Sequence, residues 1–172
     1  MRIFGIAGHS GMGKTTLLER LIPELQSRRK TVSLIKHSHK DLDIDRPGKD
    51  SYRLRQAGCQ ELILMGHKRW ALMHELREDV EPTLPDLLSK LQKCDLVLIE
   101  GFKQGDFPKL EVWRAAVGKP HLWPSCGGIV AMATDGGASV AAIPTLDLSD
   151  ITGIADFVDK HAASSALKLS HC

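Results

Sequence analysis

The sequence has no apolar run approaching the roughly 20 residues that a membrane-spanning helix requires. It also has little excess charge, because 23 Lys and Arg residues nearly balance 21 Asp and Glu residues and leave a formal net charge of +2. So small an excess gives no argument for nucleic acid or a membrane surface as a partner. The N-terminus enters an apolar segment directly, without the pattern of a signal peptide. We therefore expect a cytoplasmic protein, with no nucleic-acid partner and no membrane partner.

Cysteine is scarce as well, with four residues and no C-x-x-C pair. Scattered cysteines in a chain without an export signal are typical of reduced, mostly buried thiols rather than of disulfides. Apolar residues make up 42% of the chain and charged residues 26%, as in ordinary globular proteins. The 172 residues are enough for one domain with a sizeable core.

The most specific local signal is a complete G-x-x-x-x-G-K-[ST] phosphate-binding loop at residues 8–15. An apolar run at 2–7 precedes it as a predicted buried strand, and apolar residues at helical spacing follow it over 15–29. Glycines let successive backbone N–H groups converge on a phosphate, and the helix N-terminus adds the positive end of its dipole. Lys14 is placed to reach the β- and γ-phosphates, and the Thr15 hydroxyl to ligate Mg²⁺. The sequence therefore predicts a nucleoside triphosphate site formed by Gly8, His9, Ser10, Gly11, Met12, Gly13, Lys14, Thr15 and Thr16.

Apolar runs alternate with helical patterns along the rest of the chain, which favours a mostly parallel sheet covered by helices. Strands are predicted at 31–36, 61–65, 69–73, 96–99, 109–113 and 128–132, and helices at 15–29, 50–57, 83–92 and 150–161. The turn at Gly66-His67 joins two of these strands into a β-hairpin. The predicted fold class is α/β: a P-loop NTPase-type, mostly parallel sheet with helices on both faces, plus a β-hairpin extension. We expect a single nucleotide-binding domain over residues 1–162 and a frayed C-terminal tail over 163–172.

A phosphate loop needs an acidic partner to hold Mg²⁺, and two carboxylates flank the predicted strand at 96–99. Ligands of a doubly wound sheet bind at the carboxyl ends of its strands. At about 3.3 Å per residue, Asp95 would lie roughly 16 Å away, at the other end of the strand. Glu100 is therefore the predicted magnesium-side acid and a candidate catalytic residue, and Gly101 allows a tight turn after it. Asp95 is expected to be a surface or capping residue.

The polar loop at 37–49 leaves the second predicted strand at the same carboxyl edge. Asp45 within this loop and Asp50 just after it are candidates to reach Mg²⁺ or an attacking water, and Lys49 is a candidate to contact the γ-phosphate. Asp45 is thus a second candidate for metal binding and for catalysis, although a solvated polar loop would account for many of the same charges.

The same loop allows a different metal site. Alternating residues of an extended segment share a side, so His37 and His39 could bind a transition metal together with Asp41 and Asp43. This pattern lacks a third firm ligand for a transition metal. The magnesium interpretation of the loop does not depend on a transition-metal site.

A carboxylate also follows the predicted strand at 128–132, at Asp135. A carboxylate there can accept hydrogen bonds from both N1–H and the 2-amino group of guanine, whereas adenine offers neither donor. The common guanine-specific motif has Asn-Lys before its aspartate, and this chain has Ala133-Thr134 instead. Asp135 is a candidate guanine-binding residue; the alternative is a turn residue ahead of Gly136-Gly137.

Three stretches of the chain resemble the family of molybdopterin-guanine dinucleotide biosynthesis adapter proteins, MobB. They are the glycine loop with its flanks at 5–16, the segment 35–50 with His37-Ser38-His39 and Asp45, and Leu-Ile-Glu-Gly-Phe-Lys at 98–103. Ala-Met-Ala-Thr-Asp at 131–135 also suits the family. The stretches occur in the expected order over nearly the whole chain. The segments 35–50 and 98–103 are much more specific to this family than the glycine loop, which is generic.

The resemblance implies a protein that binds GTP and Mg²⁺ and has at most a slow intrinsic GTPase activity. It implies an adapter in molybdenum cofactor biosynthesis, whose partners are the guanylyltransferase that attaches GMP to molybdopterin and the enzyme that inserts molybdenum. Family members are homodimers in which sheets from two chains associate, so the strand at 109–113 and the hairpin strand at 69–73 are candidate dimer-forming elements.

The chain departs from the related partition ATPases at His9, where those proteins have a second lysine. A lysine reaching the phosphate of a dimer partner is therefore not supported. No position clearly supplies an orienting glutamine or an arginine finger, in line with slow hydrolysis.

Two other functions are consistent with parts of the sequence. A P-loop small-molecule kinase would need an arginine-bearing lid, for which Arg46 and the segment 52–55 are candidates, but no apolar, hinge-flanked lid is evident. The histidine loop and the scattered cysteines suggest a metallochaperone GTPase. Finally, Lys103, Lys109 and Arg114 are expected to form an exposed solvated face, with a groove for an anionic pterin phosphate as the alternative.

Overall fold

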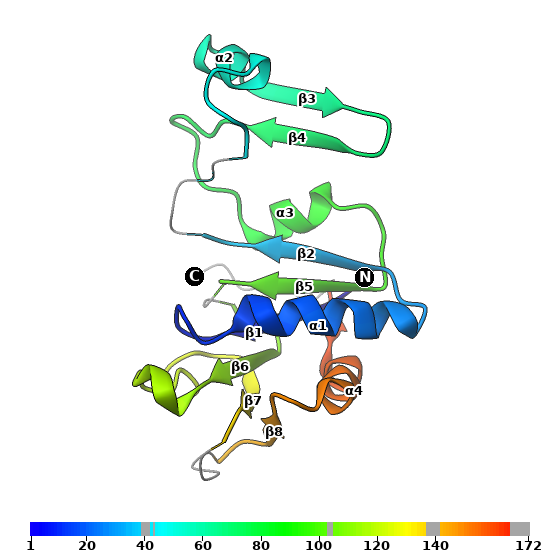
Figure 1. The fold of residues 1–172 in the computed structure, drawn as a ribbon, viewed down its shortest axis with the longest axis vertical. Helices are drawn as coiled ribbons and strands as arrows, with labels where there is room; N and C mark the ends of the chain where they lie inside the picture. The colour runs from blue at the N-terminus through cyan, green and yellow to red at the C-terminus, as the bar shows by residue number, and fades with distance from the viewer. Residues whose placement is uncertain (39–41, 43, 103–104, 137–141, 166–172) are drawn as a thin grey trace. The chain divides into compact units, whose positions relative to one another are not determined.

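The computed structural model describes residues 1–38, 42, 44–102, 105–136 and 142–165 (Figure 1). The chain divides into two compact units. Unit 1 comprises Met1–His37 and Leu87–Cys172, and unit 2 comprises Ser38–Asp86. The phosphate-binding loop belongs to unit 1, and the predicted hairpin to unit 2.

Unit 1 is built on one sheet, which has seven strands in the described residues. Its main strands are β1 (Arg2–Ala7), β2 (Val32–Lys36), β5 (Leu96–Glu100), β6 (Lys109–Trp113), β7 (Ile129–Thr134) and β8 (Thr145–Asp147). They lie in the order β2-β5-β1-β6-β7-β8, and every neighbouring pair in this order is parallel. The predicted fold class, a mostly parallel sheet with helices and a hairpin extension, is confirmed. The short strand β8 was not predicted, because its three residues are too few to show a periodicity.

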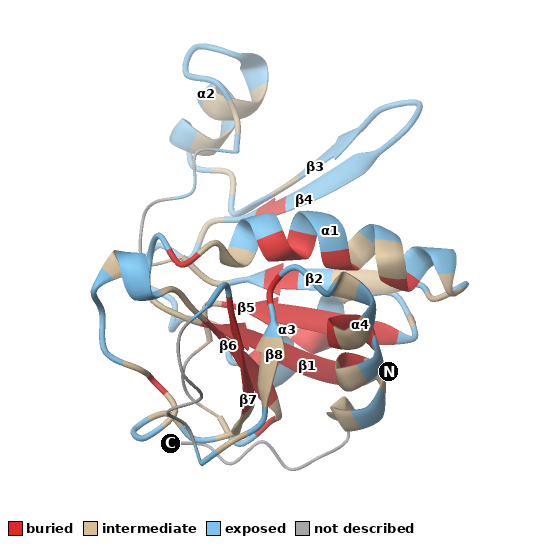
Figure 2. Ribbon diagram, turned by 60° about the horizontal axis from the view of Figure 1, so that its bottom comes forward, coloured by how far each residue is buried: buried red, intermediate tan, exposed pale blue. Residues whose placement is uncertain are grey.

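Two helices cover one face of this sheet. Helix α1 (Lys14–Ser27) follows the phosphate loop, helix α4 (Ile151–His161) follows β8, and the two contact each other. Alternate side chains of a strand point to the same face, and on this face they form the core that is red in Figure 2. Its strand residues are Phe4, Ile6, Leu96, Leu98, Leu110, Val112, Ala131 and Ala133, and its helix residues include Leu17, Leu18, Leu21, Leu25, Ile154, Ala155 and Val158.

Polar contacts fasten α1 beside α4 and β8. Arg28, just after α1, forms an ion pair with Asp156 of α4 at 2.6 Å. Arg20 in the middle of α1 donates to the carbonyls of Leu148 and Ser149 at 3.0 and 2.9 Å. The first turn of α4 is capped by Asp150, whose carboxylate accepts from the Gly153 N–H. These contacts orient α1, and therefore the loop at its N-terminus, on the sheet.

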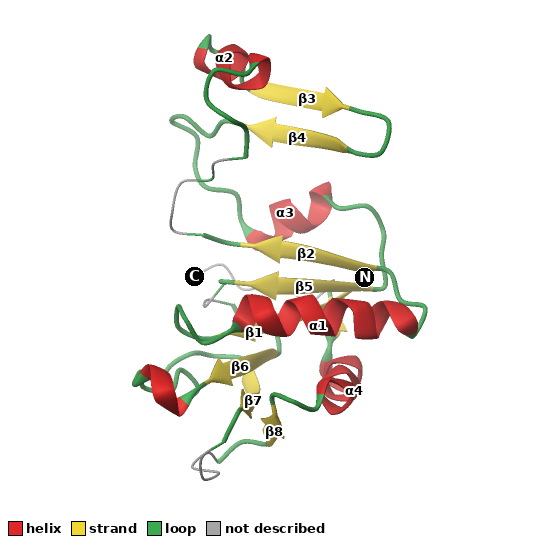
Figure 3. Ribbon diagram, in the orientation of Figure 1, coloured by secondary structure: helices red, strands yellow, loops and turns green. Residues whose placement is uncertain are grey.

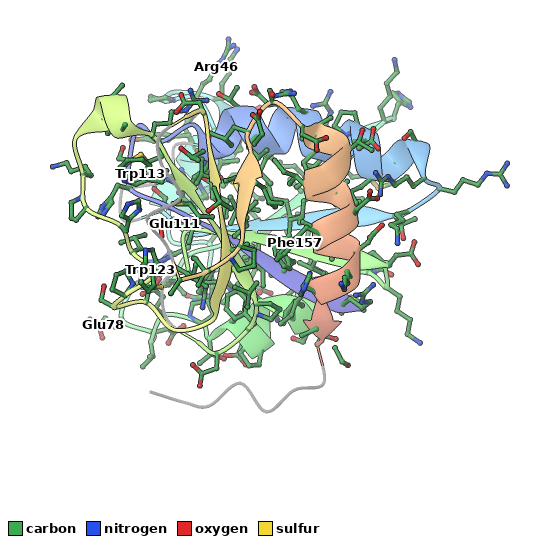
Figure 4. The ribbon with its side chains drawn as sticks, turned by 90° about the horizontal axis from the view of Figure 1, so that it is seen from below. Arg46, Glu78, Glu111, Trp113, Trp123 and Phe157 are labelled. Atoms are coloured by element: carbon green, nitrogen blue, oxygen red, sulfur yellow. The ribbon has the colours of Figure 1, made fainter. Side chains whose placement is uncertain are left out.

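The other face of β6 carries two fully buried charged residues, Lys109 and Glu111. Glu111 accepts hydrogen bonds from the backbone N–H groups of Leu122 and Trp123 at 2.6 and 3.0 Å. In Figure 4, Trp113, Glu111 and Trp123 lie together on one side of the view, and Phe157 of α4 lies on the other. The segment that follows β6, including the short 3₁₀ helix Ala115–Val117, is thereby fixed against the sheet.

The start of the predicted C-terminal tail is not frayed. Ala163 and Ser164 form strand β9, which pairs antiparallel with Ile3 and Arg2 of β1. This edge of β1 is available because β6 begins its pairing only at Gly5. Arg2 adds hydrogen bonds to the Ala162 carbonyl at 2.8 and 3.1 Å. Residues 166–172 lie outside the described residues, so the prediction for the rest of the tail is untested.

Unit 2 contains helix α2 (Asp50–Gln56) and the antiparallel hairpin of β3 (Glu61–Met65) and β4 (Trp70–His74), which Figure 3 shows in yellow. Helix α3 (Leu84–Lys90) spans the division between the units. The predicted cap of α3 is present, because the Thr83 hydroxyl accepts from the Asp86 N–H at 3.4 Å and the Asp86 carboxylate accepts from the Thr83 N–H at 2.9 Å.

Candidate functional site

The carboxyl ends of four parallel strands bring the candidate residues of unit 1 to one edge of the sheet. The phosphate loop follows β1, which lies between β5 and β6, and the register aligns Ile6 with Glu100 of β5. On the other side, Arg114 follows β6 and Asp135 follows β7, where Trp113 pairs with Thr134. Ligands of parallel α/β sheets bind at this edge. The candidate site therefore extends from Glu100, past the phosphate loop, to Asp135.

Glycine conformation shapes the phosphate loop. Gly8, Gly11 and Gly13 have φ angles of 142°, 86° and 87°, which side chains other than that of glycine rarely tolerate. A Cβ atom on Gly8 would stand 2.6 Å from the carbonyl oxygen of Val112 in β6, so glycine is also required there by close packing. The turn of the loop is therefore fixed by backbone contacts with the sheet.

The N-terminus of α1 begins at a glycine. Gly13 is its N-cap residue, in the left-handed conformation, and it has no side chain that could cap the first turn. Ser10, Thr15 and Thr16 are exposed around this end. Uncapped N–H groups at the positive end of a 14-residue helix form a ready anion site.

Lys14 lies folded across the loop that it follows. Its Nζ donates to the carbonyl of His9 at 3.1 Å, inside the turn. The buried Nε2 of His9 has no hydrogen-bond partner among the described residues. A long flexible ammonium side chain anchored on its own loop is well placed to transfer its hydrogen bonds to a phosphate.

Glu100 is nearly buried at the carboxyl end of β5, with 5% of the residue exposed. The Nζ of Lys36 lies 3.3 Å from its Oε2, yet the geometry is not that of a hydrogen bond, and Oε2 has no hydrogen-bond partner in the described part of the chain. A buried carboxylate oxygen without a donor is costly unless a cation completes it. This arrangement is compatible with a cation at Glu100, and its role in holding Mg²⁺ stays a prediction.

Asp95 lies at the opposite end of β5, beside the start of β2. Its carboxylate accepts from the backbone N–H and the hydroxyl of Thr31 at 2.8 and 2.7 Å. These hydrogen bonds lower the pKa of Asp95, and the one from the backbone N–H has the larger effect. The predicted capping role is confirmed: Asp95 fixes the start of β2 beside β5.

Asp135 is exposed at the end of β7 and forms an ion pair with Arg114, whose Nη1 lies 2.5 Å from Oδ2. The same guanidinium donates from Nε to the carbonyl of Met12 in the phosphate loop at 3.1 Å. Met12 itself is buried, and its sulfur accepts from the Arg114 N–H at 3.2 Å. The phosphate loop and the candidate base-binding carboxylate thus share one arginine, a link that sequence spacing did not reveal.

Similarity to known proteins identifies the family of the chain. The family model described as molybdopterin guanine dinucleotide synthesis protein B, MobB, matches residues 3–135. The chain belongs to the MobB family. It is 42% identical over 159 residues to the molybdopterin-guanine dinucleotide biosynthesis adapter protein of Escherichia coli, covering 91% of this chain and 90% of that protein. The protein of the same name from Haemophilus influenzae is 43% identical over 159 residues, covering 91% and 87%.

Solved structures of MobB proteins have the same fold. The crystal structure of Bacillus subtilis MobB superposes with a TM-score of 0.75 at 20% identity, covering 96% of this chain and 100% of that one. The MobB homologue from Bacillus stearothermophilus gives 0.67 at 21% identity, covering 93% and 97%. None of the described helices of this MobB-family chain is long and apolar enough to span a membrane.

Asp45 belongs to unit 2 of this MobB-family chain, where both of its oxygens bind Arg55. Nη2 of Arg55 lies 2.5 Å from Oδ1 and Nε lies 3.0 Å from Oδ2, a bidentate pair. Arg55 also pairs with Glu75, and it lowers the pKa of Asp45. A role for Asp45 in metal binding or catalysis stays a prediction, since it would require this pair to open.

The transition-metal alternative lies mostly outside the described residues, because His39, Asp41 and Asp43 are among those not described. His37 is described: its backbone N–H donates to the Glu100 carbonyl at 2.8 Å, and its ring packs on Phe102. The described residues contain no group of three potential metal ligands from His, Cys, Asp and Glu.

The expectation of an exposed basic face is wrong for Lys109. This side chain is fully buried, and its Nζ donates to the carbonyls of Gly105 and Gly127 while lying over the Phe107 ring. Burial lowers the pKa of the amine. Arg114 is only partly exposed and is occupied by the contacts above, and Lys103 lies outside the described residues.

Proposed function

We propose that this chain is a GTP-binding adapter protein of molybdenum cofactor biosynthesis, acting where GMP is attached to molybdopterin to form molybdopterin guanine dinucleotide. The 42–43% identity to two molybdopterin-guanine dinucleotide biosynthesis adapter proteins supports a role in this process. The observation that best supports the nucleotide is the shared sheet edge, where an uncapped helix N-terminus and the Asp135 carboxylate follow strands β1 and β7.

The proposed preference for guanine rests on the carboxylate of Asp135 at the end of β7. An exposed carboxylate accepts hydrogen bonds and donates none, so it matches the N1–H and 2-amino donors of guanine. Adenine presents no donor at these two positions, and a carboxylate facing it would lose its hydrogen bonds to water without replacement. The site therefore favours GTP over ATP.

Mg²⁺ fits the other end of the site. Thr15, exposed on the first turn of α1, supplies a hydroxyl, and Glu100 supplies the buried carboxylate oxygen that has no donor. Oxygen ligands of this kind, completed by waters and phosphate oxygens, suit Mg²⁺. When bound, the ion would neutralise charge on the β- and γ-phosphates. The Nζ of Lys36 lies 3.3 Å from the same carboxylate oxygen and would share it with the ion.

Hydrolysis is at most slow in this proposal. The sequence offers no clear orienting glutamine, and Arg114, the arginine beside the phosphate loop, is bound to the Met12 carbonyl and to Asp135. The GTP-bound state would therefore persist and present one surface to partner enzymes. We propose the guanylyltransferase and the molybdenum-insertion enzyme as those partners, in the cytoplasm.

Titration calorimetry of the Mg²⁺-loaded protein with GTP and with ATP, followed by overnight turnover, tests this function. We expect GTP to bind at least tenfold more tightly, which corresponds to about one hydrogen bond to a charged acceptor, and turnover to be negligible. Tighter binding of ATP, or turnover stimulated by a small metabolite, would favour the kinase alternative instead. Titration without Mg²⁺ should weaken GTP binding if Glu100 and Thr15 hold the ion.

We also propose a homodimer formed through the hairpin of unit 2. β3 and β4 expose large apolar side chains, including Ile63 at 65%, Met65 at 90% and Trp70 at 62%. A two-stranded hairpin is at best marginally stable alone, and exposed apolar surface of this kind marks an association site. The other candidate, β6, is wrong as an edge for pairing, because β1 and β7 already flank it.

Sedimentation equilibrium of the full chain should give a dimer mass, and replacing Met65 by Lys should shift it toward the monomer. Replacing the exposed Lys160 of α4 by Ala is the matched control and should leave the dimer intact. A monomeric wild-type protein at micromolar concentration would refute the dimer without affecting the nucleotide proposal.

A further inference from the structure

Arg114 connects two parts of the nucleotide site that are far apart in the sequence. It follows β6, which lies between β1 and β7, so its side chain stands between the ends of those two strands. Nε donates to the Met12 carbonyl at 3.1 Å, and Nη1 pairs with Oδ2 of Asp135 at 2.5 Å. The Arg114 backbone N–H is also held, by the Met12 sulfur at 3.2 Å.

We propose that Arg114 is the positioning residue for guanine recognition: it holds the Asp135 carboxylate at a fixed place relative to the phosphate loop. This inference rests on the proposed binding of GTP. It assigns to Arg114 a role that differs from phosphate binding, because its guanidinium contacts a loop carbonyl and a carboxylate rather than lying among the uncapped N–H groups of α1.

Asp135 needs such support because its own strand provides little. The two residues before it are Ala133, which has no polar side chain, and Thr134, whose hydroxyl donates to the Gly136 carbonyl at 3.2 Å. Neither side chain connects the end of β7 to the phosphate loop. An exposed carboxylate with two rotatable bonds would otherwise have to be ordered when the base binds, which reduces affinity.

The guanidinium suits this task. It is planar and permanently charged, and its N–H groups point along fixed directions, so one side chain can hold two acceptors at a set separation. It also packs on the loop, since a Cβ atom added to Gly13 would lie 3.2 Å from Arg114 Nε. Arg114 is therefore held by backbone contacts on the phosphate side and directs Nη1 to Asp135.

The ion pair leaves room for the base. A carboxylate has about four acceptor directions on its two oxygens, and the described donor to Asp135 uses one of them, on Oδ2. The two donors of guanine need two more. Arg114 and guanine can thus share the carboxylate.

The test compares GTP with ITP, whose base lacks the 2-amino group. The ratio of their dissociation constants isolates the contact between Asp135 and that group from phosphate binding. We expect the wild-type protein to prefer GTP by about tenfold or more, and R114A to reduce the preference to about twofold. R114K keeps the charge but cannot bridge two acceptors in a fixed plane, so its preference should lie between those of R114A and wild type.

A double-mutant cycle with D135N separates positioning from a general structural effect. If Arg114 acts through Asp135, adding R114A to D135N should leave the GTP-to-ITP ratio unchanged. The matched control is R20A, which removes an arginine of α1 whose guanidinium donates to the backbone carbonyls of Leu148 and Ser149 rather than to Asp135. It should change the melting temperature without changing the ratio.

The outcomes separate the inference from the function on which it rests. Absence of GTP binding by the wild-type protein would overturn the proposed function. GTP binding with an unchanged GTP-to-ITP ratio in folded R114A would overturn only the role of Arg114. If R114A does not fold, R114K decides. A wild-type GTP-to-ITP ratio in R114K overturns the positioning role. The role is supported if R114K reduces the ratio in the wild-type background and does not change it in the D135N background.

Discussion

Replacing Lys14 by Ala should reduce the affinity for GTP by about 10- to 100-fold in titration calorimetry. A charge-assisted hydrogen bond contributes about 1.5–3 kcal/mol, and Lys14 is the flexible cation of the phosphate loop. In the structure its Nζ donates to the His9 carbonyl at 3.1 Å, on the inner side of the loop. We expect that donor to transfer to the β- and γ-phosphates when GTP binds.

The fold should tolerate this substitution. Lys14 is the first residue of α1, where Ala is a good helix former, and its side chain is not part of the buried core. The melting temperature should therefore stay within a few degrees of the wild-type value. Lys160→Ala, at the far end of α4, is the matched control and should bind GTP normally. Wild-type affinity in the Lys14 variant would refute the assignment of residues 8–16 as the triphosphate site.

Replacing Asp135 by Asn should change the preferred base from guanine toward xanthine. The amide keeps one acceptor for N1–H but presents an N–H₂ donor where guanine has its 2-amino group, so two donors face each other. Xanthine has a carbonyl at that position, and the amide can donate to it. We expect affinity for GTP to fall about 10- to 100-fold and the affinity for xanthosine triphosphate to rise relative to GTP.

Asp147→Asn is the matched control for this substitution. Asp147 ends β8, the strand beside β7, and its carboxylate accepts from the Ser149 N–H at 2.7 Å. Its replacement removes a charge from the same edge of the sheet without altering the proposed base contact. If the Asp135 variant retains the wild-type preference for GTP, or the Asp147 variant loses it, the guanine assignment is wrong.

The local features of this protein could be predicted because each depends on a short stretch of sequence. The phosphate loop is set by three glycines that require positive φ angles within six residues. The strand at 109–113 was predicted at its exact bounds, and the end of the apolar run at 96–99 correctly distinguished Glu100 from Asp95. In a parallel sheet, position along a strand already decides which residues reach the ligand-binding edge.

Side-chain partners across the fold could not be predicted in the same way. Asp45 is a candidate for Mg²⁺ because it is acidic and lies in a loop that leaves β2, and the sequence did not indicate that Arg55 would be its bidentate partner. Lys109 was expected at the surface because it is charged, whereas the carbonyls of Gly105 and Gly127 allow it to be fully buried under Phe107. The charge of a side chain does not by itself indicate whether protein groups or water molecules will form its hydrogen bonds.

The sequence by itself determined the family, the parallel sheet and the positions of the phosphate loop and Glu100, because these depend on glycine spacing, apolar runs and motifs that lie within short stretches of the chain. Only the tertiary structure decided which groups face one another across strands. The order β1-β6-β7 brings Met12, Arg114 and Asp135 into one contact chain, although 102 residues separate the first two and 21 the last two. Such a contact depends on strand order and register, which no local pattern in the sequence specifies.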